Sequence, residues 1–203
     1  MKRIGVLLAA GRSQRMGCLK QLLPWPPQTE HSKPLIAAAY DSIARVCDAM
    51  FVVLGYRAEE VISALQARSF RHYLFVDPTA EMLQSVQKGL AAAPIAWGIS
   101  ENESIQFLLH PADHPEVRLE TLDALVTTAA ALPDRAVMPQ YRGCGGHPVL
   151  IPQTVANSVC GYAGDGGLRQ FWKEHPEMCF RLAVDDPGVV FDLDTRVDYD
   201  SRF

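Results

Sequence analysis

A basic, glycine-rich segment near the start of the sequence contains the residue types that bind phosphate. The segment Leu8–Lys20 follows directly from an apolar run. Gly11 and Gly17 allow turns in which several backbone N–H groups point at one anion. Arg15 and Lys20 add full positive charges, one forked and one compact. These features predict a phosphate cradle. A basic surface loop is the competing interpretation, because the spacing matches neither a P-loop nor a dinucleotide fingerprint.

Asp113 is the acidic residue whose setting best suits a metal ion. It follows the apolar run Ile105–Leu109 and precedes Pro115, which fixes the turn. Mg²⁺ prefers one or two carboxylates together with waters and phosphate oxygens. We therefore expect Asp113 to bind Mg²⁺, with a turn or cap aspartate as the alternative.

Alternating strand and helix patterns position these residues. Apolar runs predict strands over Ile4–Ala9, Met50–Leu54, His72–Val76, Ile105–Leu109 and Ala136–Met138. Helical spacing predicts helices over Leu35–Val46, Ala58–Arg68, Leu119–Leu132 and a segment that starts at Met82 and is ended by Pro94. Strands that alternate with helices imply parallel strands joined by right-handed crossovers.

The pattern changes after Pro139, where glycines and prolines cluster. Val149–Ile151 is expected to pair antiparallel with its neighbours and to give the sheet a mixed edge. A further helix is expected over Asp165–Glu174 with Asp165 as its cap, followed by strands near Phe180–Val184 and Val189–Asp192. The pattern predicts one α/β domain over residues 1–203.

Composition and charge exclude several classes of protein. With 48% hydrophobic and 21% charged residues the chain can build a packed core, and its apolar runs fall short of the ~20 residues that span a membrane. The net charge of −4 conceals an asymmetry, because residues 1–29 contain basic but no acidic residues. The strongly anionic remainder argues against nucleic-acid binding, whereas the basic segment suits a small anionic ligand or is a solvated positive edge. The five cysteines form no C-x-x-C pair, so we expect reduced thiols and a cytoplasmic protein.

The glycine-rich segment resembles a known family signature. Its pattern L-A-A-G-x-S-x-R-M-G-x-x-K, followed by Leu22-Leu23-Pro24, is similar to that of the molybdenum cofactor nucleotidyltransferases, especially their cytidylyltransferase branch. Further segments resemble family motifs in the same order: Gly55-Tyr56-Arg57, Leu83-Gln84-Ser85-Val86, Ala112-Asp113-His114-Pro115, Gly146-His147-Pro148-Val149, Gly164-Asp165-Gly166-Gly167 and Asp192-Leu193-Asp194-Thr195.

This resemblance implies a fold and a reaction. The fold is a Rossmann-like nucleotidyltransferase domain with a mostly parallel central sheet and an antiparallel edge in its C-terminal third. Residues 1–138 form the nucleotide-binding βα part and residues 139–203 the acceptor-side part. The implied reaction is Mg²⁺-dependent transfer of CMP from CTP to the terminal phosphate of Mo-molybdopterin, which releases pyrophosphate and gives molybdopterin cytosine dinucleotide. The implied partners are CTP, the molybdopterin cofactor and, transiently, a molybdoenzyme or its chaperone.

The resemblance also assigns roles to individual residues. The implied nucleotide-binding residues are Leu8, Ala9, Ala10, Gly11, Arg12, Ser13, Arg15, Gly17, Lys20, Gly55 and Ser85. Lys20, Arg15 and Asp113 are the implied catalytic residues, since phosphoryl chemistry needs charge neutralisation more than covalent help. Asp113 and Asp194 are the implied Mg²⁺ ligands, and His147 and Asp192 are expected on the acceptor side. The Asp-Leu-Asp spacing would place Asp192 and Asp194 on one side of a strand.

Alternatives stay open at this stage. Ala10 stands where the guanylyltransferase branch has glycine, which favours cytosine. GTP, another phosphate acceptor, or a non-catalytic carrier that delivers the cofactor are the alternatives.

Overall fold

Parallel strands from the first half of the chain lie side by side in the central sheet. The computed structural model describes residues 1–27, 29–68, 72–100 and 103–200. In spatial order the strands are β5 (His72–Phe75), β4 (Ala49–Leu54), β1 (Lys2–Ala9) and β6 (Ile105–Pro111). All three pairings between them are parallel. β1, β4 and β6 are buried along most of their length, as expected of strands covered by helices on both faces. The strands predicted from the apolar runs are confirmed.

The rest of the sheet comes from the C-terminal third of the chain. β9 (Val149–Pro152) lies between β6 and β7 (Ala136–Tyr141) and is antiparallel to both. β10 (Cys179–Ala183) extends the sheet parallel to β7, and the short β8 (Cys144–Gly145) pairs antiparallel with β7. The predicted mostly parallel Rossmann-like sheet with antiparallel pairing in this third is confirmed, and the antiparallel strand β9 is internal.

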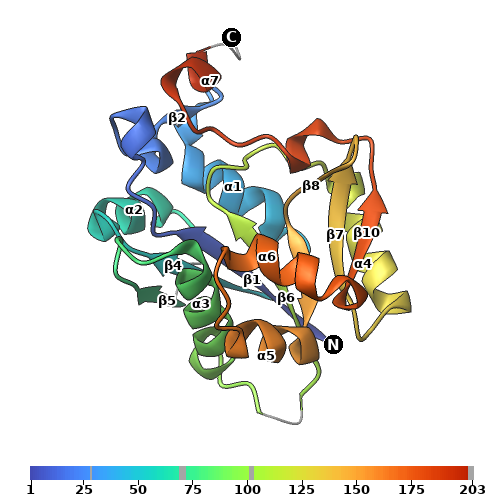
Figure 1. Ribbon diagram of the computed structural model, residues 1–203. Helices are drawn as coiled ribbons and strands as arrows, with labels where there is room; N and C mark the ends of the chain where they lie inside the picture. The colour runs from blue at the N-terminus through green and yellow to red at the C-terminus, as the bar shows by residue number, and fades with distance from the viewer. Residues whose placement is uncertain (28, 69–71, 101–102, 201–203) are drawn as a thin grey trace.

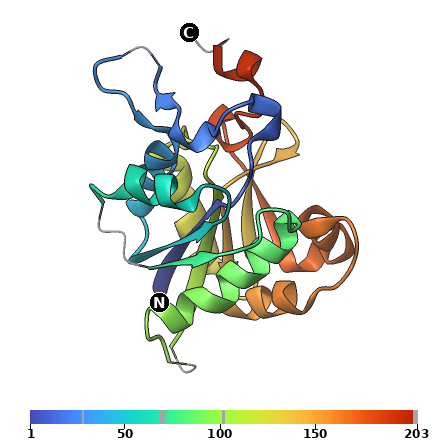
Figure 2. The same cartoon turned by 90° about the vertical axis from the view of Figure 1, so that its left-hand side faces the viewer.

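Helices cover both faces of the sheet (Figure 2). One face carries α1 (Leu35–Ala44), α2 (Ala58–Leu65) and α4 (Leu119–Ala131), and the other carries α3 (Met82–Ala96), α5 (Gln153–Gly161) and α6 (Gly167–Glu174). Each layer buries its own apolar cluster against the sheet. In the ranges that the structure describes, no helix combines the length and the apolar composition needed to span a membrane.

Helix α3 lies unusually close to the sheet at Gly89. A Cβ atom at this position would stand 2.7 Å from Cγ2 of Val53 and 3.0 Å from Cγ1 of Val6. Only the missing side chain permits this spacing. Ser85, one turn earlier, is buried. The helix thereby carries its first turns to the edge of the sheet where β1 and β4 end.

A third apolar cluster ties the last described segment of the chain to an N-terminal hairpin. The hairpin consists of β2 (Pro24–Trp25) and β3 (Lys33–Pro34), and it lies beside α7 (Arg196–Asp200) in Figure 1. Trp25 packs against Tyr199, whose hydroxyl donates a 2.6 Å hydrogen bond to the carbonyl oxygen of Pro24. Leu193 is fully buried in the same cluster. This docking fixes the segment that carries Asp194.

The strand predicted over Val189–Asp192 is wrong. The chain instead forms the 3₁₀ turn η4 (Pro187–Val189) and then runs on without regular structure to Asp194. The turn forms because buried Asp186 accepts the N–H groups of Gly188 and Arg118. Asp192 and Asp194 therefore do not share the face of a strand.

Other helix boundaries also differ from those predicted. α3 continues two residues beyond Pro94 and ends before Gly98, whose φ of 60° lets the chain turn away. The cap residue of α6 is Gly166, at φ 89°, so Asp165 is not the cap. α5 and α7 were not predicted: α5 begins directly after β9, and α7 is short and mostly polar.

Candidate active site

A pocket of about 690 Å³ opens where the parallel strands end. Leu8 from β1 and Pro111 from β6 are register partners, so the loops after these strands start side by side. Ligands of open α/β sheets bind beyond the carboxyl ends of the strands. Of the predicted site residues, the pocket is lined by Leu8, Gly11, Arg12, Ser13, Arg15, Lys20, Asp113 and Asp194. The structure thus brings eight of the predicted residues to one cavity.

The glycine-rich segment is shaped by two short 3₁₀ turns, η1 (Gln14–Met16) and η2 (Lys20–Leu22). Gly17 ends η1 at φ 71°, a conformation that favours glycine. The Ser13 hydroxyl accepts the backbone N–H of Lys20 at 3.2 Å, so it closes the loop. These turns place the side chains of Arg15 and Lys20 over the pocket.

Gln21 braces this loop from inside the protein. It is buried, its side chain accepts the Ser13 hydroxyl at 3.0 Å, and it donates to the Gly11 carbonyl at 3.2 Å. Gln21 is not among the site residues predicted from the sequence. A polar residue between Lys20 and two leucines was the available signal, because a glutamine in such a setting needs buried partners.

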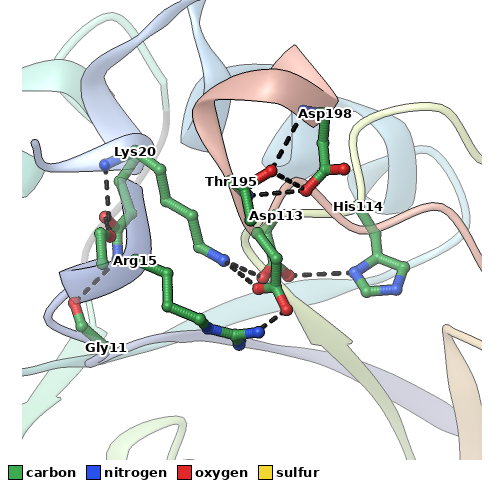
Figure 3. A network of polar contacts seen from close by, with 10 residues as sticks. Gly11, Arg15, Lys20, Asp113, His114, Thr195 and Asp198 are labelled. Carbon is green, nitrogen blue, oxygen red and sulfur yellow. Dashed lines mark hydrogen bonds and ion pairs between the residues drawn. The ribbon is translucent and has the colours of Figure 1, made fainter. Parts of the chain in front are cut away.

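Two cations and two carboxylates meet at the mouth of the pocket (Figure 3). Lys20 Nζ lies 2.6 Å from Oδ2 of Asp113 and 3.1 Å from Oδ1 of Asp194. Arg15 Nη2 lies 2.7 Å from Oδ2 of Asp194. The Lys20 side chain is 14% exposed and that of Arg15 is 71% exposed, so Lys20 forms the interior of the network and Arg15 its solvent edge.

The network keeps its interior groups charged. Burial alone would raise the pKa of the Asp113 carboxyl, but the hydrogen bond from His114 and the charge of Lys20 outweigh it and hold that pKa well below its usual range. Burial works to lower the pKa of the Lys20 amine, but the Asp113 charge and hydrogen bonds to both carboxylates raise it. Asp113 is therefore a carboxylate at neutral pH, which is the form that binds a metal ion.

Three histidines pack behind Asp113. His114 donates from Nδ1 to Oδ1 of Asp113 at 3.0 Å, and His110 donates from Nε2 to the His114 carbonyl at 2.8 Å. The His147 ring lies 5.3 Å from the His114 ring, measured between centroids. Burial lowers the pKa of His147 to about 4. His114 is buried, and its hydrogen bond orients Asp113.

A small annex of about 90 Å³ adjoins the main pocket beside α3. Ala10 and Ser85, both predicted to bind nucleotide, line it. Gly55 lies behind Ala10, where a Cβ atom would stand 2.6 Å from the Ala10 carbonyl oxygen. Gly55 therefore supports the annex without lining it. The loop Pro78–Ala80, which was not predicted as part of the site, closes the other side.

Other predicted residues lie outside the main pocket. Ala9 points to the opposite face of the sheet, where it is 1% exposed, and Gly17 shapes the loop. His147 lines a separate pocket on the far side of the histidine cluster. Asp192 is exposed and lines neither the main pocket, the annex nor the His147 pocket.

The carboxylates of Asp113 and Asp194 suit a hard divalent cation whose remaining ligands come from water and a bound substrate. Among the described residues, no group of three His, Cys, Asp or Glu side chains is arranged to hold a metal by itself. Asp113 and Asp194 nevertheless already converge on one positive charge, the Lys20 ammonium. Two carboxylates that leave the remaining positions to water and phosphate are the usual protein share of a Mg²⁺ site.

Comparisons with known proteins agree with this geometry. The family model described as MobA-like NTP transferase domain matches residues 5–178. The molybdenum cofactor cytidylyltransferase of Escherichia coli (strain K12) is 24% identical over 96% of this chain and 92% of its own length. The purine catabolism protein PucB of Bacillus subtilis (strain 168) is 28% identical over 97% of this chain and 94% of its own length.

Two solved structures are similar to this chain over nearly its whole length. The crystal structure of Rv0371c from Mycobacterium tuberculosis H37Rv has a TM-score of 0.80 and 28% identity, covering 100% of this chain and 98% of that one. A crystal structure of Rv0371c in complex with manganese has a TM-score of 0.74 and 27% identity, covering 99% of this chain and 97% of that one.

Proposed function

The chain belongs to the family of MobA-like NTP transferase domains and is a nucleotidyltransferase, and from this premise we propose that it transfers CMP from CTP to the terminal phosphate of Mo-molybdopterin. The observation that carries the proposal is the convergence of Lys20 and Arg15 with Asp113 and Asp194 at the mouth of one pocket. The full-length similarity to a molybdenum cofactor cytidylyltransferase supports the choice of substrates.

The glycine-rich loop and its cations hold the triphosphate. Gly11, Arg12 and Ser13 line the pocket, and Arg12 and Arg15 bring positive charge to it. Lys20 neutralises charge on the transferred phosphate and the departing pyrophosphate, an effect that is strong in a partly buried site. The annex beside Ala10 and Ser85 receives the base.

Asp113 and Asp194 hold Mg²⁺ in the proposed site. When bound, the ion stabilises negative charge on the phosphate oxygens and orients the triphosphate. His114 keeps the Asp113 carboxylate ionised and turned toward the pocket. The Lys20 ammonium lies between the two carboxylates, and a bound triphosphate would offer it a second anionic partner.

The transfer itself needs no strong base. An oxygen of the acceptor phosphate attacks the α-phosphorus of CTP, the bond from that phosphorus to the bridging oxygen breaks, and pyrophosphate leaves with the electron pair. The acceptor phosphate has a second pKa of about 6 and is largely dianionic at neutral pH. Residues 1–138 serve the nucleotide and residues 139–203 the acceptor, with Asp194 crossing from the second part to the first.

The proposed enzyme works in the cytoplasm. All five cysteines have free thiols in the structure, and Cys18 and Cys144 are exposed. Exposed thiols of this kind stay reduced in a cytosolic environment.

Pyrophosphate release tests the proposal. The purified protein is given Mg²⁺ and Mo-molybdopterin with CTP, GTP, ATP or UTP in separate reactions, and the dinucleotide product is identified by mass. We expect release with CTP and formation of the cytosine dinucleotide. Release with GTP alone would assign the chain to guanylyl transfer. CTP binding without any release would contradict transfer to this acceptor and favour another acceptor or a carrier.

A further inference from the structure

We propose that the pocket on the far side of the histidine cluster binds an anionic group of the acceptor other than the phosphate that reacts. This inference rests on the proposed function and specifies its acceptor as a molecule with at least two separate anionic groups. The pocket measures about 740 Å³ and is called the basic pocket below. Its defining residues are Arg169, Lys173, Arg181, His147 and Trp172.

Three cations line the basic pocket without a balancing carboxylate. Arg169 and Lys173 stand one turn apart on α6, and Arg181 projects from β10. No Asp or Glu lines the pocket, and within the described part of the chain none of the three cations forms an ion pair. Like charges one turn apart destabilise a helix, so a bound anion is the natural counter-charge.

The burial of α6 fixes the positions from which Arg169 and Lys173 project, and both of these residues are exposed. Phe171 and Trp172, which lie between Arg169 and Lys173 in sequence, are buried against the sheet. The amphipathic helix therefore has a fixed rotation, with its basic side turned away from the core. Arg181 is anchored from the neighbouring strand, since its Nη1 contacts Sδ of Met138 at 3.5 Å.

The floor of the basic pocket is bare backbone. Gly145 and Gly146 connect β8 to the turn before β9. A Cβ atom on Gly146 would lie 2.2 Å from the Val189 carbonyl oxygen, and one on Gly145 would lie 2.8 Å from Nη1 of Arg181. A side chain at either position would push against Val189, Met138 or Arg181, so the two glycines allow this wall of the pocket to pack closely around Arg181.

The histidine cluster joins the basic pocket to the active site. His147 lines the basic pocket, its ring packs against His114, and His114 is hydrogen bonded to Asp113. His147 and His114 therefore stand between the basic pocket and Asp113, and an acceptor that spans the two sites would lie along these two residues. The acceptor this favours has its reacting phosphate at one end and a second anionic centre at the other. An acceptor whose sole charge is the reacting phosphate would leave the three cations unused.

Charge-removing variants test the acceptor side. Two variants remove charge from the basic pocket: the double variant Arg169→Gln/Lys173→Gln and the single variant Arg181→Gln. The matched control is Arg45→Gln, which removes one charge at the end of α1. Loss of a charge-assisted contact should raise KM for Mo-molybdopterin by about tenfold or more. KM for CTP should stay within about twofold of wild type. An unchanged KM for the acceptor would overturn the proposal.

A binding measurement separates this inference from the proposed reaction. The indole N–H resonance of Trp172, assigned with Trp172→Phe, is followed during titration with inorganic sulfate at constant ionic strength. We expect a saturable shift in wild type and Arg45→Gln that is lost in the Arg169→Gln/Lys173→Gln protein. That result would support the anion site even if Mo-molybdopterin proved not to be the acceptor. A shift that is absent in wild type, or equal in all variants, would overturn it.

Discussion

Lys20 Nζ lies 2.6 Å from the carboxylate of Asp113, so one residue assigned to the triphosphate neutralises a residue assigned to the metal. The same ammonium also bonds to Asp194 at 3.1 Å. In the proposed site, a metal ion and Lys20 would compete for the two carboxylates until a bound triphosphate gave Lys20 a new partner. This competition has consequences that can be measured.

Replacing Lys20 by Met should change metal binding and catalysis in opposite directions. Without the ammonium, Asp113 and Asp194 repel one another, and a divalent cation relieves that repulsion. We expect Mn²⁺ to bind nucleotide-free Lys20→Met about tenfold more tightly, while kcat falls by about 10²- to 10³-fold. Calorimetric titration with Mn²⁺ measures the first effect. Lys33→Met, which removes a cation paired with Asp41, is the control and should leave Mn²⁺ binding unchanged.

Replacing His114 should weaken the metal site through Asp113. His114→Phe removes the 3.0 Å hydrogen bond to the carboxylate while keeping a ring of similar size. Loss of a partner that orients a ligand typically costs about 10- to 100-fold in metal affinity or activity. His114→Asn, which retains a donor, should recover part of the loss. Equal kcat and equal Mn²⁺ affinity in the Phe variant and in wild type would show that Asp113 is positioned without His114.

Ala10→Gly should shift nucleotide preference toward GTP. The substitution removes a methyl group from the wall of the annex and leaves more room for a purine. One methyl group in a pocket is worth about 1–3 kcal/mol, so the ratio of kcat/KM for CTP to that for GTP should fall by about tenfold or more. Competition between the two nucleotides in one reaction gives the ratio directly. An unchanged ratio would mean that residues other than Ala10 select the base.

Stability should fall as the pH drops below neutrality, and His147 should contribute to the loss. The native pKa of His147, held to about 4 by burial beside His114, lies below the ordinary value of 6.5. The unfolded chain therefore binds the proton more readily, and stability present above pH 6.5 is lost as pH falls toward 4. Urea unfolding at several pH values should show a smaller loss in His147→Gln than in wild type. Parallel curves for the two proteins would argue against a role for this histidine.

The sequence was sufficient to assign Lys20 and Asp113 to one site, and the structure brings them into contact. The two residues are 93 positions apart, but each follows an apolar strand, and neighbouring parallel strands deliver their loops to one edge of the sheet. The contact of Asp194 with Lys20 depends instead on how Trp25 and Tyr199 dock the last described segment. Side-chain packing of that kind leaves no periodic pattern in the sequence. The motif Asp192-Leu193-Asp194-Thr195 could therefore be recognised, but the strand predicted over Val189–Asp192 was wrong.

Buried polar residues were the other part that the sequence could not predict. Gln21 and His110 lie within or beside apolar runs, where either a core or a surface position fits the pattern. Their partners are backbone carbonyls of Gly11 and His114 and the Ser13 hydroxyl, and these come close only once the loops have folded. Their roles therefore follow from three-dimensional proximity.

The close contact of Gly89 with the sheet helps to set the width of the annex, because it fixes how near helix α3 lies to the sheet. Ser85 and Met82, which line the annex, ride on the same helix, and the spacing of that helix from the sheet is limited by the contact of Gly89 with Val53. A single added methyl at 89 would lift the helix and widen the annex without altering any residue that a nucleotide touches. The size of the base that the annex accepts can thus depend on residue 89, which does not line the annex. A comparison of lining residues alone would overlook this position.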